Sequence, residues 1–246
     1  MISVDQLTKR YGAFTAVDGI SFSVAPGEVL GLVGPNGAGK TTTLRCLSGI
    51  IAPSTGRVAI AGHDLQTDGV KAKHALAFIP DEPHLFEHLT VEEHLRFVAR
   101  IYGVADVEER IGPVLDELEL GDKRRSLPDE LSRGMKQKLA IACGLLHSPQ
   151  ALVLDEPLTG LDPSGMRRMR ATIAARARAG TAVILSSHLL TLVEELCTKL
   201  FVIRHGKCVA YGPLSEIVST RPELAGRPLE DIFLALTGEG EHPVPA

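Results

Sequence analysis

The segment GPNGAGKT at 34–41 combines glycines, a lysine and a hydroxyl group in a spacing that suits phosphate binding. It fits the pattern G-x-x-x-x-G-K-[ST], directly after an apolar stretch that indicates a strand and at the start of a helix. Glycines let successive backbone N–H groups curl around phosphate oxygens, and the helix start adds positive potential. The pattern predicts a nucleoside triphosphate site formed by Gly34, Pro35, Asn36, Gly37, Ala38, Gly39, Lys40, Thr41 and Thr42.

Three side chains of this loop have separate expected roles. Lys40 would reach the β- and γ-phosphates, which makes it a catalytic candidate as well as a nucleotide-binding one. The Thr41 hydroxyl is predicted to bind Mg²⁺, and Thr42 to contact the α-phosphate side. A glycine-rich turn that matches the pattern by accident is the alternative, and the flanking strand and helix argue against it.

The tripeptide Asp-Glu-Pro ends an apolar stretch twice, in FIPDEP at 78–83 and in VLDEP at 153–157. An acid at the carboxyl end of a buried parallel strand lies in the crevice where α/β sheets bind ligands. We therefore predict that Asp155 holds Mg²⁺, directly or through water. Glu156 is predicted to polarise the water that attacks the γ-phosphate. A solvated strand end is the alternative, and it is disfavoured beside a phosphate-binding loop.

These candidate residues need a scaffold of strands that deliver them to one edge of a sheet. Apolar stretches bounded by turn residues predict strands at 27–34, 54–62, 74–80, 151–157 and 181–187, and a hairpin at 199–212. Helical spacing follows the phosphate-binding loop up to Gly49, occupies 163–180 and continues after 187 to about Cys197. Strands that alternate with helices predict an α/β fold with a mostly parallel sheet covered on both faces.

A block of helical spacing interrupts that alternation. Stretches at 89–104, 107–120 and 132–146 show the pattern, with Thr90 as the expected N-cap of the first. We predict a single domain over 1–246, with a helical subdomain inserted at about 84–150. The 246 residues, 44% of them hydrophobic, can bury a sizeable core. The tail GEGEHPVPA is expected to be loose.

Composition narrows the kind of partner and the compartment. The 26 basic and 30 acidic residues give a net charge of −4, which argues against nucleic acid as the main partner. Cys46, Cys143, Cys197 and Cys208 have no C-x-x-C spacing, which favours a reducing, cytosolic compartment over a disulfide or zinc framework. The start lacks a signal-peptide pattern, and no apolar run approaches the roughly 18 residues that span a bilayer. We expect any membrane span to belong to another chain.

Further motifs resemble those of ABC ATPases. LSRGMKQKL at 131–139 is similar to the family's signature sequence, TGLDP at 159–163 to its D-loop, and SSH at 186–188 to its switch-histidine strand. Tyr11 resembles the aromatic residue that stacks on adenine. The motifs follow the family's order from Tyr11 to His188, so the resemblance covers nearly the whole chain. It implies a P-loop NTPase (RecA-like) core sheet with a helical subdomain and a small antiparallel β element near the N-terminus.

The resemblance also implies how two phosphate-binding helix starts are used. Ser132 precedes a predicted helix, so its hydroxyl and the amides near Gly134 can form a second anion site. In the family, two such chains meet head to tail, and this second site contacts the γ-phosphate of the partner's ATP. His188 is similar to the histidine that bonds the γ-phosphate and the attacking water; a structural histidine is the alternative. Asp162 would link the two sites across the interface.

Three positions depart from the family's common pattern. Arg133 stands where the commonest signature has glycine, and Met135 where glutamine is frequent; such variants occur among exporter-type members. Asp81 stands where the family's Q-loop has glutamine. A carboxylate can also offer oxygen to Mg²⁺, directly or through water, so we expect Asp81 to bind the metal and sense the nucleotide. Glu82 is expected to face solvent or a partner.

The function implied by the resemblance is an ATP-binding and ATP-hydrolysing subunit that binds MgATP, dimerises and powers a separate transmembrane permease, with export preferred. Such a subunit would be cytoplasmic and peripheral on the inner face of the membrane. A soluble ABC ATPase acting on ribosomes or DNA is the alternative, although this chain has one set of motifs and no long coiled-coil insertion. An ATP-gated binding module without hydrolysis is disfavoured because Glu156, Lys40 and His188 are all present.

Two further patterns suggest other chemistry. HLFEH at 84–88 matches H-x-x-E-H, but a zinc protease needs that pattern on a helix, and this segment precedes the expected cap Thr90. We expect a partner-facing loop there and no zinc. The arginine-rich stretch at 166–180 can be interpreted as a nucleic-acid or membrane patch, and a solvated helix face is the preferred interpretation.

Overall fold

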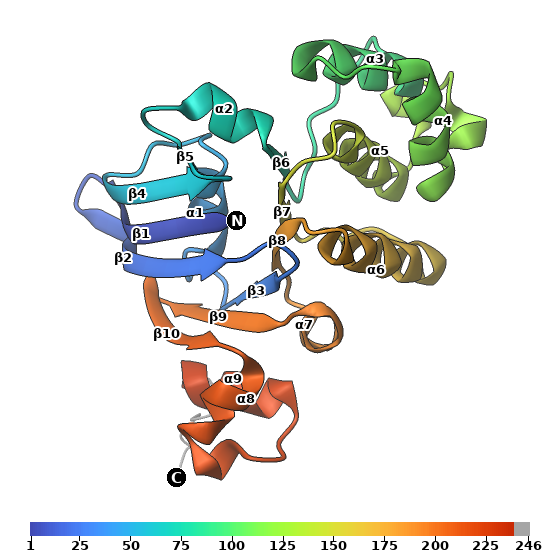
Figure 1. Cartoon of the computed structure of the whole chain (residues 1–246). Helices are drawn as coiled ribbons and strands as arrows, with labels where there is room; N and C mark the ends of the chain where they lie inside the picture. The colour runs from blue at the N-terminus through green and yellow to red at the C-terminus, as the bar shows by residue number, and fades with distance from the viewer. Residues whose placement is uncertain (239–246) are drawn as a thin grey trace.

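The computed structural model describes residues 1–238, so nearly all of the predicted loose tail lies outside the described residues. Two sheets and a group of helices make up the described part (Figure 1). The α/β class, the parallel core sheet and the separate antiparallel element predicted from the sequence are all confirmed.

The larger sheet is parallel except at one edge. Its strand order is β10-β9-β3-β8-β7-β6, and only the β9–β10 hairpin pairs antiparallel. The strands are β3 (Val29–Val33), β6 (Leu76–Ile79), β7 (Ala151–Asp155), β8 (Ala182–Ser186), β9 (Lys199–Arg204) and β10 (Lys207–Gly212). Every residue of β3, β7 and β8 is buried, which explains why these strands are continuous apolar runs rather than alternating ones.

The smaller sheet is antiparallel and lies over one face of the parallel sheet (Figure 1). It contains β2 (Phe14–Val24), β1 (Ile2–Tyr11), β4 (Thr55–Ile60) and β5 (His63–Asp64), in that order. Helix α1 (Lys40–Leu47) packs between the two sheets, where Leu44 and Leu47 share a hydrophobic core with both. The strand predicted at 54–62 is β4, which belongs to this sheet because it pairs antiparallel with β1.

Helices cover the other face of the parallel sheet. They are α5 (Arg133–Leu146), α6 (Pro163–Arg178), α7 (Leu190–Leu196), α8 (Leu214–Ser219) and α9 (Leu229–Thr237). The last two, α8 and α9, were not predicted from the sequence. The stretch predicted as a strand at 74–80 is shorter, since α2 (Gly69–His74) ends where it was expected to begin.

The predicted helical block is present as α3 (Val91–Tyr102), α4 (Val107–Glu117) and α5. Two short 3-10 turns, at Gly121–Lys123 and Pro128–Glu130, lie between α4 and α5. Thr90 caps α3 as expected, in a reciprocal capping box with Glu93. Arg96 and Arg124 both pair with Glu92, and Arg96 also pairs with Glu108, so charged side chains join the block on its surface. The division of the chain into a core and an inserted subdomain stays a prediction.

The parallel sheet brings the motif residues to one edge. The phosphate-binding loop follows β3, Asp81 comes two residues after β6, Glu156 follows β7, and His188 comes two residues after β8. Because parallel strands end at the same edge, four segments far apart in sequence meet there.

Candidate active site

The phosphate-binding loop is held by close backbone packing. A Cβ atom on Gly34 would lie 2.2 Å from the carbonyl oxygen of Ile203, and one on Gly39 would lie 2.5 Å from that of Ala16. Gly39 also has a φ of 109°, in the left-handed region, as the N-cap of α1. The two glycines are therefore required by contact with neighbouring strands, and they fix the loop on the sheet edge.

Lys40 folds back over the loop that precedes it. Its Nζ donates to the carbonyl oxygens of Gly34 at 2.6 Å and Pro35 at 3.1 Å. An ammonium group placed over successive loop carbonyls and beside a helix start can exchange these contacts for phosphate oxygens. The position is the one the sequence motif predicts for a lysine that binds phosphate.

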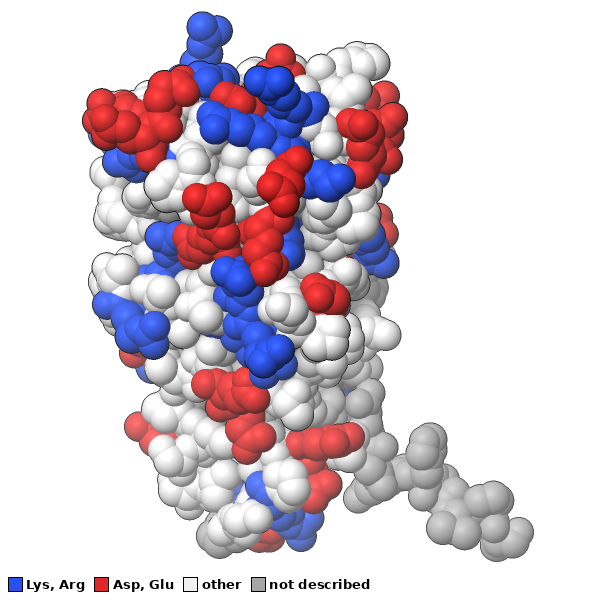
Figure 2. Space-filling view, turned by 90° about the vertical axis from the view of Figure 1, so that its right-hand side faces the viewer, with Lys and Arg blue, Asp and Glu red and all other residues white. Residues whose placement is uncertain are grey.

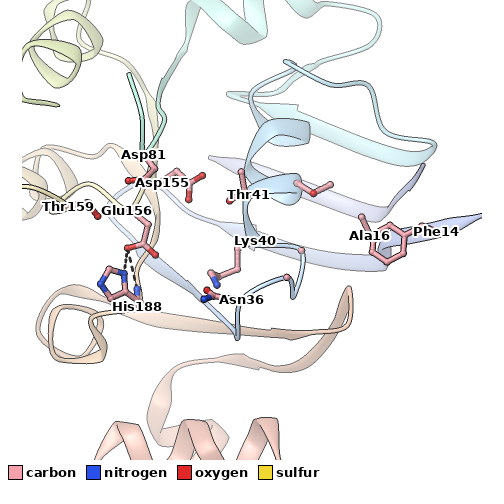
Figure 3. Close-up of a pocket in the computed structure, with 13 residues that line it drawn as sticks. Phe14, Ala16, Asn36, Lys40, Thr41, Asp81, Asp155, Glu156, Thr159 and His188 are labelled. Atoms are coloured by element: carbon pink, nitrogen blue, oxygen red, sulfur yellow. Dashed lines mark hydrogen bonds and ion pairs between the residues drawn. The ribbon is translucent and has the colours of Figure 1, made fainter. Parts of the chain in front are cut away.

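Asp155 and Glu156 stand at the end of β7 and have different surroundings. Asp155 is 5% exposed, and its Oδ1 accepts a hydrogen bond from the Ser186 hydroxyl of the neighbouring strand. Glu156 has a φ of 49°, in the left-handed region, and its N–H donates to the Ser186 carbonyl at 3.1 Å. Such a backbone conformation is costly for a side chain other than glycine, and here it turns the Glu156 carboxylate toward the cavity (Figure 3).

Glu156 and His188 form the main pair of side chains in the site. Glu156 Oε2 lies 2.8 Å from His188 Nδ1 and accepts from the His188 N–H at 3.3 Å. Burial raises the pKa of Glu156 above its usual value, and His188 and Lys40 oppose that rise. A partly buried carboxylate with a raised pKa, held by an imidazole, has the properties of a general base.

These groups line one open cavity of about 570 Å³. Its lining residues are Phe14, Ala16, Asn36, Gly37, Gly39, Lys40, Thr41, Thr42, Asp81, Asp155, Glu156, Thr159 and His188. A second cavity, of about 400 Å³, adjoins it and adds Gly34 and Pro35 together with Phe233 of α9. Ala38 is buried beneath the loop. The cavity thus joins the phosphate-binding loop to the metal candidates Asp81 and Asp155. The catalytic candidates Glu156 and His188 line the same cavity.

Tyr11, the predicted adenine-stacking residue, does not line the cavity. Phe14 does, 63% exposed, on the strand opposite Tyr11 in the β1–β2 hairpin. Tyr11 is also exposed, with Lys9 Nζ 5.0 Å from its ring centroid, so its role stays a prediction. The sequence analysis missed Phe14, Ala16 and Thr159. The tight turn at Gly12 was the available signal for Phe14, since it sets two aromatic residues across one hairpin.

The predicted signature residues Ser132 and Gly134 and the D-loop residue Asp162 do not line this cavity, although Thr159 at the start of the D-loop does. Ser132 caps α5 and accepts from the Met135 N–H at 3.2 Å, and Asp162 caps α6 and accepts from the Gly165 N–H at 3.1 Å. A Cβ on Gly134 would lie 2.6 Å from the carbonyl oxygen of Gly160, so the signature helix packs directly on the D-loop. The chain therefore has a second helix start that contributes nothing to its own cavity.

The side-chain oxygen atoms that line the cavity are suitable ligands for Mg²⁺. Thr41, Asp155 and Asp81 all line it, and hydroxyl and carboxylate oxygens are the ligands this hard cation prefers. Asp81 Oδ1 is buried and accepts no hydrogen bond from the described residues. A carboxylate oxygen in that condition fits a position for a cation or an ordered water. The metal roles of these residues stay predictions.

The profile of the ABC transporter family matches residues 17–159, more than half of the chain. The chain belongs to the ABC transporter family. It is 34% identical over 242 residues to linearmycin resistance ATP-binding protein LnrL of Bacillus subtilis (strain 168), covering 98% of this chain and 76% of that protein. It is 38% identical over 221 residues to Nod factor export ATP-binding protein I of Paraburkholderia xenovorans (strain LB400), covering 89% of this chain and 73% of that protein.

A solved ATP-binding subunit of an ABC transporter has the same fold. The two chains superpose with a TM-score of 0.91 at 34% sequence identity, over 96% of this chain and 99% of that one. The family hydrolyses ATP, so this ABC transporter chain is an ATP-binding ATPase, as the sequence motifs predict.

Two other sequence patterns, HLFEH at 84–88 and the arginine-rich stretch at 166–180, have structural explanations in this ABC ATPase. Residues 84–88 form a loop and turn, as expected, and not the helix that the zinc-protease pattern requires. Within α6, Arg168 pairs with Glu119, Arg170 with Glu195, and Arg176 with Glu117. These arginines therefore pair with carboxylates of neighbouring segments, and the interpretation of the stretch as a solvated helix face stays a prediction. Across residues 1–238, no helix is long and apolar enough to cross a membrane.

Proposed function

We propose that this ATPase dimerises on ATP and drives a separate transmembrane permease, in the direction of export. The observation that carries the proposal is the cavity in which Lys40 and the Glu156–His188 pair converge, while the signature helix start lies apart from it. A site with a phosphate-binding loop and a base, next to an unused anion-binding helix start, suits a reaction that needs a second chain.

The proposed hydrolysis assigns one task to each residue. Glu156 orients a water molecule and takes its proton as the oxygen attacks the γ-phosphorus, and His188 holds the Glu156 carboxylate in place. Lys40 and the loop N–H groups balance charge on the β- and γ-phosphates as the bond between them breaks. Mg²⁺, held by Thr41 and Asp155 with Asp81 nearby, supplies further charge neutralisation when bound.

The proposed dimer uses the second helix start. Ser132 and Gly134 stand at the start of α5 and do not line the chain's own cavity, which suits a phosphate presented by a partner copy. Asp162 caps the adjoining helix and would lie at the same interface. Each ATP would then be enclosed by the loop of one chain and the signature of the other.

We propose that the permease docks on the segment from Asp81 to Leu89 and the adjoining helices. Phe86, Phe97 and Ile101 are exposed there to 53%, 40% and 61%, and the Phe86 and Phe97 rings meet edge to face at 5.0 Å. Buried His94 holds this loop, because its Nε2 accepts from the Phe86 N–H at 2.9 Å. Exposed apolar side chains grouped on a fixed loop are typical of a protein-binding surface.

A cavity of about 450 Å³ lies beside these aromatic residues. Its lining combines the charged side chains Glu87, Asp129 and Lys136 with apolar ones that include Leu85 and Leu127. A short amphipathic helix of a permease would fit such a groove, with apolar residues inward and polar residues at the rim.

The proposal places the chain on the cytoplasmic face of a membrane, attached through the permease. Export is favoured because one similar protein carries export in its name and another resistance. The alternative, an ABC ATPase acting on ribosomes or DNA, is less well supported. On the face that carries the helices, Figure 2 shows basic and acidic side chains intermixed, whereas binding a nucleic-acid backbone favours a continuous basic surface.

The proposal is tested by isolating the full chain in mild detergent and identifying the protein that accompanies it. A multi-spanning membrane protein is expected, and a ribosomal or DNA-associated complex would contradict the proposal. For the dimer, Glu156→Gln with MgATP should double the molar mass measured by light scattering. Adding Ser132→Arg to that variant should restore the monomer while nucleotide still binds. A Glu156→Gln chain that stays monomeric would rule out ATP-driven dimerisation.

A further inference from the structure

Helix α5 holds the Q-loop at two consecutive residues. Gln137 Nε2 donates to the Pro80 carbonyl at 3.5 Å, and Arg133 lies one turn earlier with its Nη2 3.8 Å from Asp81 Oδ1. At the other end of the helix, a Cβ on Gly144 would lie 2.6 Å from Ile79. Helix α5 therefore packs along β6 and the loop after it. Among these contacts, the one from Arg133 to Asp81 reaches a residue that lines the cavity.

Asp81 is one of three carboxylates that line the nucleotide cavity, and it has the weakest partner (Figure 3). Asp155 accepts a hydrogen bond from the Ser186 hydroxyl, and Glu156 one from the His188 N–H. Asp81 Oδ1 is buried and accepts no hydrogen bond from the described residues, and Arg133 Nη2 lies 3.8 Å from it. A buried carboxylate oxygen in that state responds to any change in nearby charge.

The Arg133 side chain is placed by the D-loop. Gly160 has a φ of 79°, and a Cβ there would lie 3.2 Å from Cγ and Cδ of Arg133. The aliphatic part of the arginine therefore lies over Gly160, which directs the guanidinium toward Asp81. Arg133 and Asp81 are also two of the positions at which the sequence departs from the family's common pattern, and the fold brings them together.

We propose that Arg133 is a positioning residue that neutralises Asp81 of its own chain and thereby sets how strongly the cavity distinguishes Mg²⁺-bound from Mg²⁺-free nucleotide. The proposal rests on the proposed function, because it takes this cavity as the nucleotide site. With Arg133 present, the charge of Asp81 is partly balanced and a nucleotide polyphosphate can enter. When Mg²⁺ accompanies the nucleotide, Asp81 has a second cation with which to interact.

Removing either partner should change nucleotide binding in opposite directions. In Arg133→Gln the unbalanced Asp81 repels phosphate, so affinity without Mg²⁺ should fall more than affinity with Mg²⁺. In Asp81→Asn the repulsion is lost, so affinity without Mg²⁺ should rise and the benefit of Mg²⁺ should shrink. Partly exposed ion pairs contribute modestly, so each ratio of affinities with and without Mg²⁺ should change by about two- to fivefold.

The experiment measures binding of a non-hydrolysable ATP analogue with Mg²⁺ or with EDTA, at a chain concentration where light scattering shows a monomer. The double variant Asp81→Asn/Arg133→Gln closes a thermodynamic cycle with the two single variants. We expect the double variant to match Asp81→Asn alone, because Arg133 acts through Asp81. If Arg133→Gln changes the ratio equally in both backgrounds, or in neither, the proposal is overturned.

A second measurement uses the chain without nucleotide. Backbone amides at 80–89 should exchange with deuterium faster in Arg133→Gln than in wild type, since one of the two contacts that α5 makes to Pro80 and Asp81 is gone. Arg125→Gln, which removes an exposed arginine from the same helical block, should change neither the exchange nor the affinity ratio. If exchange at 80–89 is unchanged in Arg133→Gln, the ion pair between Arg133 and Asp81 does not hold the Q-loop, and the proposal is overturned. Failure of wild type to bind nucleotide would refute the proposed function instead.

Discussion

Two helix starts in this chain look equivalent as sequence motifs and are built in different ways. Helix α1 begins at Gly39 with no side-chain cap, and its loop is fixed by backbone packing against neighbouring strands. Helix α5 begins at Ser132 with a side-chain cap, and its first residue, Arg133, reaches Asp81. The first start is held by backbone packing, whereas the second combines backbone packing on the D-loop with side chains that can exchange partners. Changes at the first should therefore abolish function, and changes around the second should adjust it.

The largest effect is expected at the core site from Glu156→Gln. Loss of the base should lower ATP turnover by about 10²–10⁴-fold, while the amide keeps the shape of the side chain. Nucleotide affinity of the monomer should change little, because the proposed role of Glu156 is to contact the water and not the phosphates. Steady-state phosphate release measures the effect, and turnover equal to that of wild type would exclude Glu156 as the base.

The pH dependence of the same residue sharpens this expectation. Burial raises the pKa of Glu156, so the carboxylate is protonated at a higher pH than an ordinary glutamate. Only the ionised form can accept a proton. Turnover should therefore be at its maximum above this raised pKa and should decline as the pH falls through it. Turnover should be measured at saturating MgATP from pH 8 downward. We expect its decline to begin while the pH is still above 4.5, the usual pKa of a glutamate. A decline only below that value would contradict the assignment.

The backbone packing of the phosphate-binding loop can be broken at one glycine and spared at another. Gly34→Ala places a methyl group 2.2 Å from a backbone oxygen and should cost about 3 kcal/mol of unfolding free energy. Gly37→Ala is the matched control: its Cβ meets nothing within 4 Å, so it should cost about 1 kcal/mol for its left-handed φ. Urea unfolding compares the two, and equal costs would show that packing does not fix the loop.

Lys40→Ala tests the charge of the core site rather than its shape. Loss of charge-assisted bonds to the phosphates should lower ATP affinity by about 10- to 100-fold. The exposed Lys71→Ala, on helix α2, provides a control with the same change of charge and no expected effect. Equilibrium titration with a fluorescent ATP analogue measures both variants. Unchanged affinity in Lys40→Ala would count against the phosphate-binding assignment.

The smallest effect is expected in the helical block, which surface ion pairs join. Hydrogen bonds from Arg124 and Arg96 lower the pKa of Glu92 to about 2. Because the folded-state pKa is depressed, the stabilisation is present above the ordinary value near 4.5 and is lost as the pH falls toward 2.

Glu92→Gln should therefore lower Tm by about 2–4 °C at pH 7, the shift for ~1 kcal/mol in a chain of this size. Thermal unfolding from pH 7 to pH 3 should show the difference between variant and wild type shrinking with acid. A difference that is constant with pH would indicate a packing effect instead of ion pairing.

Much of the fold could be predicted because local sequence patterns were strong. The buried strands of the parallel sheet are unbroken apolar runs, and Thr90 and Ser132 cap the helices that follow them. The strand predicted at 54–62 is present as β4, but the sequence did not indicate which sheet it joins, because its antiparallel partner β1 is near the N-terminus and strand pairing over long sequence distances leaves no local signal. Helices α8 and α9 were missed.

The sequence by itself determined the residue types of the nucleotide site, since a phosphate-binding loop, paired acids after a strand and a histidine after another strand are defined by short spacing. Only the tertiary structure decided that Phe14, and not Tyr11, lines the cavity, and that Asp81 lies beside Arg133. Short motifs are encoded in consecutive residues, whereas these contacts depend on strand order and helix packing. For Asp81 and Arg133 the fold brings together residues about fifty positions apart.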